Sequence, residues 1–282
     1  MKLCRYGNAG SEKAGLVDHA GRLRDLSGIV PDIGPNTLAP ETLAKLAATQ
    51  PESLPLVEGN PRIGVPVNGI SKYIAIGLNY SDHAREANMR VPPEPIIFMK
   101  AISCLCGPND DTLQPRNSSQ LDWEVELAVV IGRKGLYVSE DEALDYVAGY
   151  CLANDVSERA FQLQSSQWDK GKGCDTFGPL GPWLVTTDEI TNPQNLDMWL
   201  DVNGERMQSG NTSTMIFGVK HLVSYCSRYM TLSPGDVIAT GTPPGVGLHK
   251  KPHPVYLKPG DIVTLGIAGL GQQRQKIIAP AA

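Results

Sequence analysis

Leu121-Asp-Trp-Glu-Val-Glu-Leu-Ala-Val-Val-Ile131 alternates polar and apolar residues at its start and becomes continuously apolar at its end. This pattern predicts a β-strand over residues 123–131 that starts half-buried and then enters the core. Residues i and i+2 of a strand point to the same face, so Glu124 and Glu126 are expected side by side. Two carboxylates there repel each other, and a divalent cation is the natural partner that offsets this cost. A solvent-facing strand edge with alternating charge is the alternative interpretation.

The rest of the chain contains many short strands and scattered helices, which predicts an α+β fold. Asn203-Gly204 accepts the positive φ angles of a type I′ turn and therefore predicts a hairpin. Helical spacing of apolar residues predicts a helix over residues 217–229. Further strands are predicted at residues 147–154, 196–202, 205–208, 236–240 and 261–267.

The chain is expected to divide into a small N-terminal domain, residues 1–68, and a larger domain, residues 69–282. Residues 51–66 are rich in Pro and Gly and are typical of a connector. Within the smaller domain, short strands are predicted at residues 3–6, 14–18 and 22–26, and a helix at residues 41–48. We expect this domain to pack against the larger one.

Composition excludes several classes of protein. The chain has 282 residues, a formal net charge of −5 and no long basic segment, which argues against nucleic-acid or membrane-surface binding. No stretch approaches the roughly 20 apolar residues that a membrane-spanning helix needs, and the first residues lack the apolar core of a signal peptide. We therefore expect a cytoplasmic protein whose six cysteines are reduced thiols.

A candidate catalytic pair lies in Asn79-Tyr-Ser-Asp-His-Ala-Arg-Glu-Ala87. The segment is typical of a helix start that Ser81 or Asp82 would cap by accepting free backbone N–H groups. His83 and Glu86 are three residues apart and therefore share one helical face. A carboxylate beside an imidazole fixes its tautomer and raises its basicity, which suits the activation of water. A solvated surface pair is the alternative interpretation.

Asp155 ends an apolar run and can supply a third carboxylate ligand for Mg²⁺ or Mn²⁺. Alternatively, Asp155 caps a helix predicted at residues 157–162. Residues 168–179 form a glycine-rich loop with two lysines, and a lysine in such a loop can hold a substrate carboxylate. A plain solvated loop has the same composition.

The glycine-rich segment 239–247 lets the backbone approach a ligand closely. Exposed N–H groups there, together with the Thr242 hydroxyl, are suited to stabilising a developing oxyanion, although a plain Gly/Pro turn would look similar. The remaining histidines lack acidic partners at a telling spacing, and no role is predicted for them: they are His19, His221, His249 and His253.

Six motifs occur together in one order: Gly77-Leu-Asn-Tyr-Ser-Asp-His-Ala-Arg-Glu86, Pro95-Ile-Ile-Phe-Met-Lys100, Glu124-Val-Glu126, Asn154-Asp155, Gly171-Lys-Gly-Cys-Asp-Thr-Phe-Gly-Pro179 and Thr240-Gly-Thr-Pro-Pro-Gly-Val-Gly247. Over about residues 70–270, this set resembles the fumarylacetoacetate hydrolase superfamily. The resemblance is greatest to bacterial 2,4-diketo-3-deoxy-L-rhamnonate and -fuconate hydrolases, whose close relatives are often labelled ureidoglycolate lyase. Gly173-Cys174 departs from the Ser-Phe of many relatives.

The resemblance implies a catalytic domain with the family's mixed β-roll, usually assembled as a homodimer, and a bound Mg²⁺ or Mn²⁺ ion. The implied metal ligands are Glu124, Glu126 and Asp155. The implied catalytic residues are His83, Glu86 and Lys172. The implied substrate-binding residues are Lys100, Arg159, Gln162 and Thr242.

The implied activity is metal-dependent hydrolysis of the C3–C4 bond of a 2,4-diketo acid to pyruvate and a hydroxy acid such as lactate. Three other reactions use the same metal and enolate chemistry and stay open: ureidoglycolate cleavage, oxaloacetate decarboxylation, and isomerisation or hydration of an unsaturated 2-oxo acid. The pair of His83 and Glu86 favours hydrolysis because it supplies a base for water. The expected partner is a small 2-oxo acid, and an inert binding protein on the same fold is the non-enzyme alternative.

Overall fold

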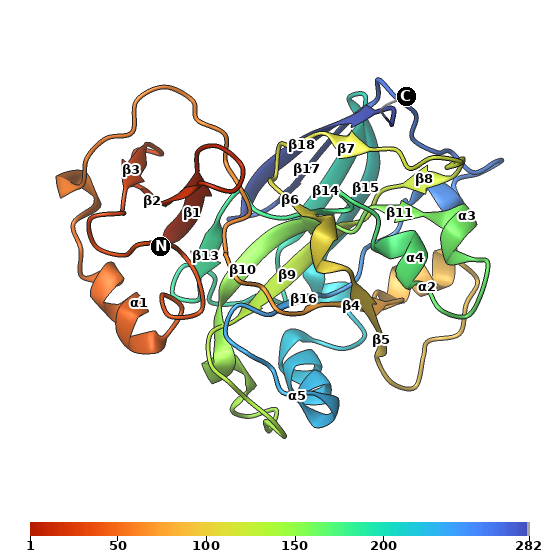
Figure 1. The fold of residues 1–282 in the computed structure, drawn as a ribbon. Coiled ribbons are helices and arrows are strands. Elements are labelled where there is room, and N and C mark those ends of the chain that lie inside the picture. The colour runs from red at the N-terminus through yellow and green to blue at the C-terminus, as the bar shows by residue number, and fades with distance from the viewer. Residues whose placement is uncertain (281–282) are drawn as a thin grey trace.

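A nine-stranded mixed sheet forms the centre of the molecule in the computed structural model, which describes residues 1–280 (Figure 1). The strands follow one another in the order β3-β2-β1-β13-β10-β9-β16-β4-β5. Their bounds are β1 (Lys2–Tyr6), β2 (Lys13–Val17), β3 (Leu23–Asp25), β4 (Tyr73–Gly77), β5 (Ile96–Lys100), β9 (Val125–Ile131), β10 (Val147–Asn154), β13 (Leu184–Thr186) and β16 (Val237–Ala239).

A second sheet of five strands and five α-helices complete the architecture. The sheet has the order β15-β14-β17-β18-β7, with bounds β7 (Thr112–Leu113), β14 (Asp197–Val202), β15 (Glu205–Asn211), β17 (Ile262–Ile267) and β18 (Gly271–Ile278). Two short pairs join β6 (Leu105–Cys106) to β12 (Gly178–Pro179) and β8 (Leu121–Asp122) to β11 (Ser157–Glu158). The helices are α1 (Pro40–Ala47), α2 (Ser81–Glu86), α3 (Arg159–Gln162), α4 (Asp169–Lys172) and α5 (Val219–Tyr229). The predicted α+β fold is therefore confirmed.

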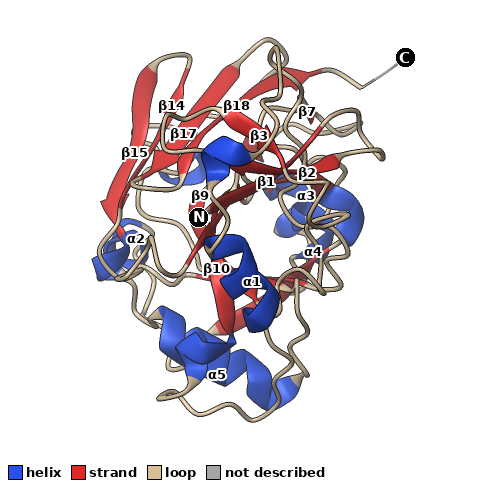
Figure 2. Cartoon of the chain, turned by 90° about the vertical axis from the view of Figure 1, so that its left-hand side faces the viewer, coloured by secondary structure: helices blue, strands red, loops and turns tan. Residues whose placement is uncertain are grey.

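Strands β9 and β10 lie between the second sheet and helix α5 in both side views (Figures 1 and 2). Every residue of β9 is buried, as its apolar run predicts. The strand begins at Val125 rather than at the predicted Trp123, because side chains take over two of its backbone bonds. The Trp123 N–H donates to the Asp122 carboxylate at 2.8 Å, and the Glu124 N–H donates to the Asn154 side chain at 3.1 Å.

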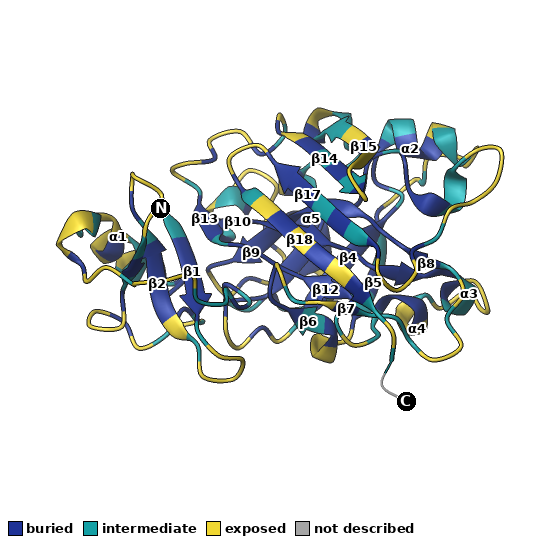
Figure 3. Cartoon of the chain, turned by 90° about the horizontal axis from the view of Figure 1, so that it is seen from above, coloured by how far each residue is buried: buried dark blue, intermediate teal, exposed yellow. Residues whose placement is uncertain are grey.

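The N-terminal strands extend the central sheet. Strand β1 pairs antiparallel with β13, and Leu3 and Leu16 belong to the same hydrophobic cluster as Val129. Figure 3 shows α1, β1 and β2 at one end of the molecule and α2, α3 and α4 at the other. The domain boundary at residue 68 stays a prediction, but any boundary there divides a continuous sheet.

Two local predictions have different outcomes. The hairpin is confirmed, since Asn203 and Gly204 have φ angles of 52° and 83° between β14 and β15. The helix predicted at residues 157–162 is wrong in its first part, because residues 157–158 pair with β8 as strand β11 and the helix starts at Arg159. No helix within residues 1–280 is long and apolar enough to cross a membrane.

Candidate active site

Three buried carboxylates meet where β9 and β10 lie side by side. Glu126 belongs to β9, Glu124 immediately precedes that strand, and Asp155 directly follows β10. The antiparallel register pairs Glu126 with Ala153, and the Asp155 N–H donates to the Glu124 carbonyl at 2.9 Å. Oxygen atoms of the three carboxylates lie within 4.8 Å of one another. The alternative of a solvent-facing charged edge is therefore wrong.

Buried cations neutralise part of this acidic charge. Lys172 Nζ lies 2.9 Å from Glu124 and 2.7 Å from Asp155. Arg159 donates to the other oxygen of Glu124 at 2.6 Å, and Lys100 donates to Asp155 at 2.5 Å. Burial alone would raise the pKa of Glu124, but Lys172 and Arg159 outweigh it and hold that pKa well below its usual range. Glu124 is therefore ionised in the folded protein.

Among residues 1–280, no cationic side chain forms an ion pair with Glu126. The Gly241 N–H donates to its carboxylate at 2.8 Å. Burial raises the pKa of Glu126 well above its ordinary value, and the carboxylates of Asp155 and Glu124 add to the effect. A divalent cation held by the three carboxylates would supply the missing positive charge, and such hard oxygen ligands suit Mg²⁺ and Mn²⁺. The donor set therefore fits a divalent metal ion.

A histidine–carboxylate pair lies on α2, near these carboxylates. His83 Nδ1 is 3.0 Å from Glu86 Oε2, and the Gly245 N–H donates to the same carboxylate at 3.0 and 3.1 Å. Burial opposes ionisation of Glu86, but the hydrogen bonds from His83 and Gly245 outweigh it and lower the pKa of Glu86. His83 is buried, so the pair is not the solvated surface pair of the alternative interpretation.

The start of α2 differs from its prediction. Tyr80 occupies the N-terminal boundary position, and no side chain caps the helix. Asp82 instead accepts the His83 N–H at 3.0 Å and the Thr214 hydroxyl at 3.2 Å. The predicted cap position is therefore wrong, although Asp82 accepts one free N–H group of the first turn as predicted. Asp82 also ties α2 to the segment after β15.

Close packing of α3 on α4 brings Lys172 and Arg159 to the same carboxylate, Glu124. A Cβ atom at Gly171 would lie 2.4 Å from the Gln162 backbone nitrogen, so this approach requires glycine. Arg159 also donates to the Gln162 side chain at 2.9 Å. Helix α3 is capped by Glu158, whose side chain accepts the Ala160 N–H at 3.1 Å. The alternative role of Asp155 as a helix cap is therefore wrong.

A cavity of about 270 Å³ collects most of the predicted site residues. Seven of them line it: His83, Glu124, Glu126, Arg159, Gln162, Lys172 and Thr242. Glu86, Lys100 and Asp155 are absent from its wall and lie behind residues that line it. The apolar residues that line the cavity include Leu78, Met89, Phe98, Leu163, Trp168 and Leu248, of which Met89 and Leu163 are exposed. The cavity thus combines an ionic floor, a histidine–carboxylate pair and an apolar mouth.

This arrangement agrees with the comparisons with known proteins. A family model described as "Fumarylacetoacetate (FAA) hydrolase C-terminal" matches residues 72–278. The chain belongs to the fumarylacetoacetate hydrolase family. It is 60% identical over 278 residues to 2,4-didehydro-3-deoxy-L-rhamnonate hydrolase of Sphingomonas sp. (strain SKA58), with 98% of this chain and 96% of that protein covered.

Solved structures of the fumarylacetoacetate hydrolase family share the whole fold. Fumarylacetoacetate hydrolase from psychrophilic Exiguobacterium antarcticum is 34% identical, with a TM-score of 0.86 over 99% of this chain and 100% of that one. Maleylpyruvate hydrolase from Sphingobium sp. SYK-6 is 27% identical, with a TM-score of 0.82 over 99% of this chain and 100% of that one. The chain is therefore an enzyme of a family that contains hydrolases of small molecules.

Two predicted substrate-binding residues, Lys100 and Thr242, already form hydrogen bonds within the protein. The Lys100 side chain is fully buried, and it donates to Asp155 and to the Lys172 carbonyl. The Thr242 hydroxyl donates to the Val125 carbonyl at 2.9 Å and accepts from Gln208 at 2.8 Å. Their roles in substrate binding stay predictions, and these contacts show Lys100 holding Asp155 of the carboxylate triad and Thr242 holding β9.

Asp122 and His249 extend the site beyond the predicted residues. Asp122 accepts the Arg159 Nε–H at 2.8 Å and the backbone N–H groups of Gly247 and Leu248 at 2.7 and 3.0 Å. His249 lines the cavity, with its ring centroid 5.6 Å from that of His83. No local sequence signal marks His249, because the residue that it faces is remote in the chain.

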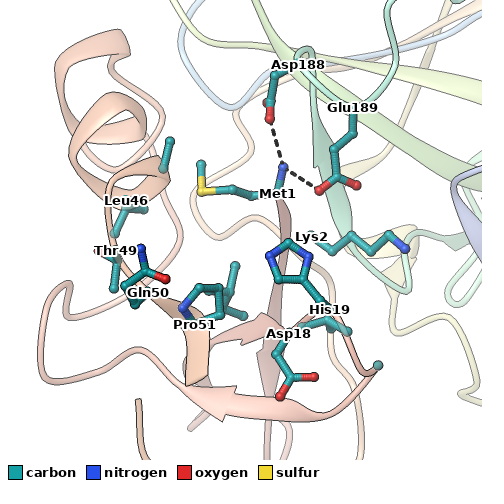
Figure 4. A pocket seen from close by; sticks show the side chains of 14 residues that line it. Met1, Lys2, Asp18, His19, Leu46, Thr49, Gln50, Pro51, Asp188 and Glu189 are labelled. Carbon is teal, nitrogen blue, oxygen red and sulfur yellow. Dashed lines mark hydrogen bonds and ion pairs between the residues drawn. The ribbon is translucent and has the colours of Figure 1, made fainter. Parts of the chain in front are cut away.

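A larger cavity of about 440 Å³ lies far from these groups, between the N-terminal strands and the segment after β13 (Figure 4). Its three acidic side chains are already paired. The Met1 amino group contacts Asp188 at 3.4 Å and Glu189 at 2.9 Å, and Asp18 is held by Arg24 at 2.8 Å. It contains neither the carboxylate triad nor the histidine–carboxylate pair, so we place the reaction in the smaller cavity.

Proposed function

We propose that the chain hydrolyses the C3–C4 bond of a 2,4-diketo acid, with 2,4-diketo-3-deoxy-L-rhamnonate or the corresponding fuconate derivative as substrate. The products are pyruvate and lactate. The observation that carries the proposal is that His83, paired with Glu86, lines the same cavity as Glu124 and Glu126. A base for water and a cation site are the two parts that this hydrolysis needs. The name of the Sphingomonas relative supports the choice of substrate.

His83 is the proposed general base. Because Nδ1 faces the Glu86 carboxylate, that nitrogen carries the proton and Nε2 has a free lone pair. Nε2 takes a proton from water as the water oxygen bonds to C4. The π electrons of the C4 carbonyl move onto its oxygen, which gives a tetrahedral oxyanion. As that carbonyl re-forms, the C3–C4 electron pair moves into the pyruvate half as an enolate, and the His83 imidazolium returns the proton to C3. Glu86 stabilises the imidazolium that forms between these two proton transfers.

Arg159, Gln162 and Lys172 are proposed to bind the carboxylate and 2-oxo end of the substrate. All three line the cavity, and the two cations already neutralise Glu124 there. Burial alone would lower the pKa of Lys172, but Asp155 and Glu124 outweigh it and raise that pKa. Lys172 is therefore an ammonium group that favours the anionic enolate.

Glu124, Glu126 and Asp155 are proposed to hold Mg²⁺, with Mn²⁺ as a functional substitute. When bound, such an ion supplies Lewis-acid stabilisation of enolate charge, which makes carbon a tolerable leaving group. We further propose a cytoplasmic homodimer, on the strength of the family resemblance.

The test is product analysis on four substrates, with Mg²⁺ and after treatment with EDTA. The panel is 2,4-diketo-3-deoxy-L-rhamnonate, acetylpyruvate, oxaloacetate and ureidoglycolate. Metal-dependent pyruvate from the first two, with an equal amount of lactate or acetate, would support the proposal. Pyruvate from oxaloacetate alone would indicate a decarboxylase. Glyoxylate from ureidoglycolate alone would indicate a lyase, and either result would overturn the assigned reaction.

A further inference from the structure

The outer part of the active-site cavity contains an imidazole that the steps above do not use. His249 lines the cavity, and its ring is inclined by 59° to that of His83. Within residues 1–280, its ring nitrogens have no hydrogen-bond partner in the protein. The side chain is half-buried, and its ring nitrogens are not among the fully buried polar atoms that lack a partner in residues 1–280, so the ring is open to the cavity. An imidazole in this state is available to bind a polar group of a ligand.

The backbone that carries His249 is fixed from the charged end of the cavity. Asp122 accepts the N–H groups of Gly247 and Leu248, and it also accepts the Arg159 Nε–H. A Cβ atom at Gly247 would lie 2.0 Å from the Val255 carbonyl oxygen, so the backbone of this turn packs too closely for any side chain at that position. One carboxylate therefore holds both Arg159 and the turn that ends at His249. The fold therefore fixes the position of His249 relative to Arg159.

Apolar side chains lie beside His249 at the mouth of the cavity. Leu248, Met89 and Leu163 all line it. Met89 is 53% exposed and Leu163 is 61% exposed, so both leave apolar surface open to a ligand. A small apolar group of a ligand would cover part of this surface and gain free energy from burial. The mouth thus offers one polar contact next to an apolar surface.

We propose that His249 hydrogen-bonds the C5 hydroxyl of the substrate, while Leu248, Met89 and Leu163 contact its C6 methyl group. The proposal rests on the function assigned above. In a linear six-carbon acid, the C1 and C2 oxygens occupy the ionic floor and C4 lies at His83. C5 and C6 then lie beyond His83, where His249 is the next polar side chain. This outer subsite decides which 2,4-diketo acid is cleaved.

The protonation state of His249 suits this role. Burial lowers the pKa of His249, and the neighbouring His83 lowers it further. The ring is therefore neutral at pH 7, with one nitrogen that donates and one that accepts. A hydroxyl group can both accept from and donate to such a ring, whereas a carboxylate or an ammonium group can use one nitrogen alone.

The test compares kcat/KM for two substrates that differ by one hydroxyl, with the full chain and Mg²⁺. They are 2,4-diketo-3-deoxy-L-rhamnonate and 2,4-dioxohexanoate, which has the same carbon skeleton without the C5 hydroxyl. His249→Leu is expected to lower kcat/KM about 10- to 100-fold for the hydroxylated substrate, as loss of one buried hydrogen bond does. The value for 2,4-dioxohexanoate is expected to change less than about 3-fold. His249→Gln, which keeps a donor and an acceptor, should recover part of the loss.

A matched control and a second variant sharpen the test. His253→Leu alters an exposed histidine four residues further along, outside the cavity, and should leave both substrates unchanged. Leu248→Ala should reduce the preference for 2,4-dioxohexanoate over acetylpyruvate, which is one methylene shorter, by about 4-fold.

Three results would overturn the inference. Equal losses on both substrates after His249→Leu would show that His249 serves the common chemistry or holds the turn. Unchanged rates on both would show that it makes no productive contact with the C5 hydroxyl. If the wild-type chain cleaves neither diketo acid, the proposed function fails and this inference fails with it. In the first two results the wild-type chain is active, so failure of this inference alone is distinguishable from failure of the proposed function.

Discussion

Glu86→Gln tests the histidine–carboxylate pair with little change of shape. Glu86 Oε2 lies 3.0 Å from His83 Nδ1. A unit charge at that distance from an imidazolium is worth on the order of 5 kcal/mol at an effective dielectric constant of about 20. The Glu86 side chain is 24% exposed, so screening reduces this to about 2–3 kcal/mol, the range of a charge-assisted hydrogen bond. The expected loss in kcat is therefore at least about 30-fold.

The assay is the initial rate of pyruvate release from 2,4-diketo-3-deoxy-L-rhamnonate at saturating Mg²⁺. Glu140→Gln is the matched control, because Glu140 pairs with His221 Nδ1 at 2.8 Å on the surface, outside the cavity. That variant should retain wild-type kcat, and both variants should bind Mg²⁺ as the wild type does. A folded Glu86→Gln variant with kcat within about 3-fold of wild type would refute the assignment of His83 as a carboxylate-assisted base.

Three further variants test the metal site, the glycine-rich segment 239–247 and the stability of the protein in acid. Glu126→Gln should raise the melting temperature of the metal-free protein, because it removes a buried carboxylate without a cationic partner. The same variant should show a smaller further rise in melting temperature when Mn²⁺ is added. Thermal unfolding with and without Mn²⁺ measures both effects. Gly245→Ala should cost about 2–4 kcal/mol in urea unfolding, since φ is +107° and a Cβ atom would lie 2.0 Å from the Met207 carbonyl oxygen. Burial alone would raise the pKa of Asp18, but hydrogen bonds, including one from Arg24, lower it to about 2 from an ordinary value of 3.8. The stability that Asp18 contributes is therefore complete above about pH 4 and falls as the pH drops toward 2. The difference in urea unfolding midpoint between wild type and Asp18→Asn should decrease over that pH range.

Short sequence spacings predicted part of the site correctly. The i, i+2 spacing on a strand brings Glu124 and Glu126 together, and the i, i+3 spacing on a helix brings His83 and Glu86 together. These relations depend on the local backbone alone, so they are visible without knowledge of the fold. Asn203-Gly204 is local in the same sense, since its turn depends on the φ angles of two residues.

The contacts that the sequence could not predict join residues from distant parts of the chain. Asp122 holds Arg159 and the turn before His249, and no spacing reveals that these elements meet. The glycine-rich loop did not reveal that the two closest partners of Lys172 are carboxylates of the protein. Buried Gln208 satisfies the Val125 N–H at 3.0 Å, a bond that the strand pattern assigns to a neighbouring strand.

The N-terminal region shows the same limit on a larger scale. Its short strands and its helix were predicted close to their observed positions. Their placement depends on β1 pairing with β13, far along the chain. Sequence patterns report which segments form strands, whereas the order of strands in a sheet depends on nonlocal packing.

Hydrolysis of the diketo acid in H₂¹⁸O tests the central claim most directly. If a water molecule activated by His83 bonds to C4, each turnover must place one ¹⁸O in the lactate carboxylate and release one pyruvate for each lactate. His83→Ala should abolish both products while Mg²⁺ binding persists. Pyruvate without an equal amount of lactate, or lactate that carries no ¹⁸O, would contradict the account.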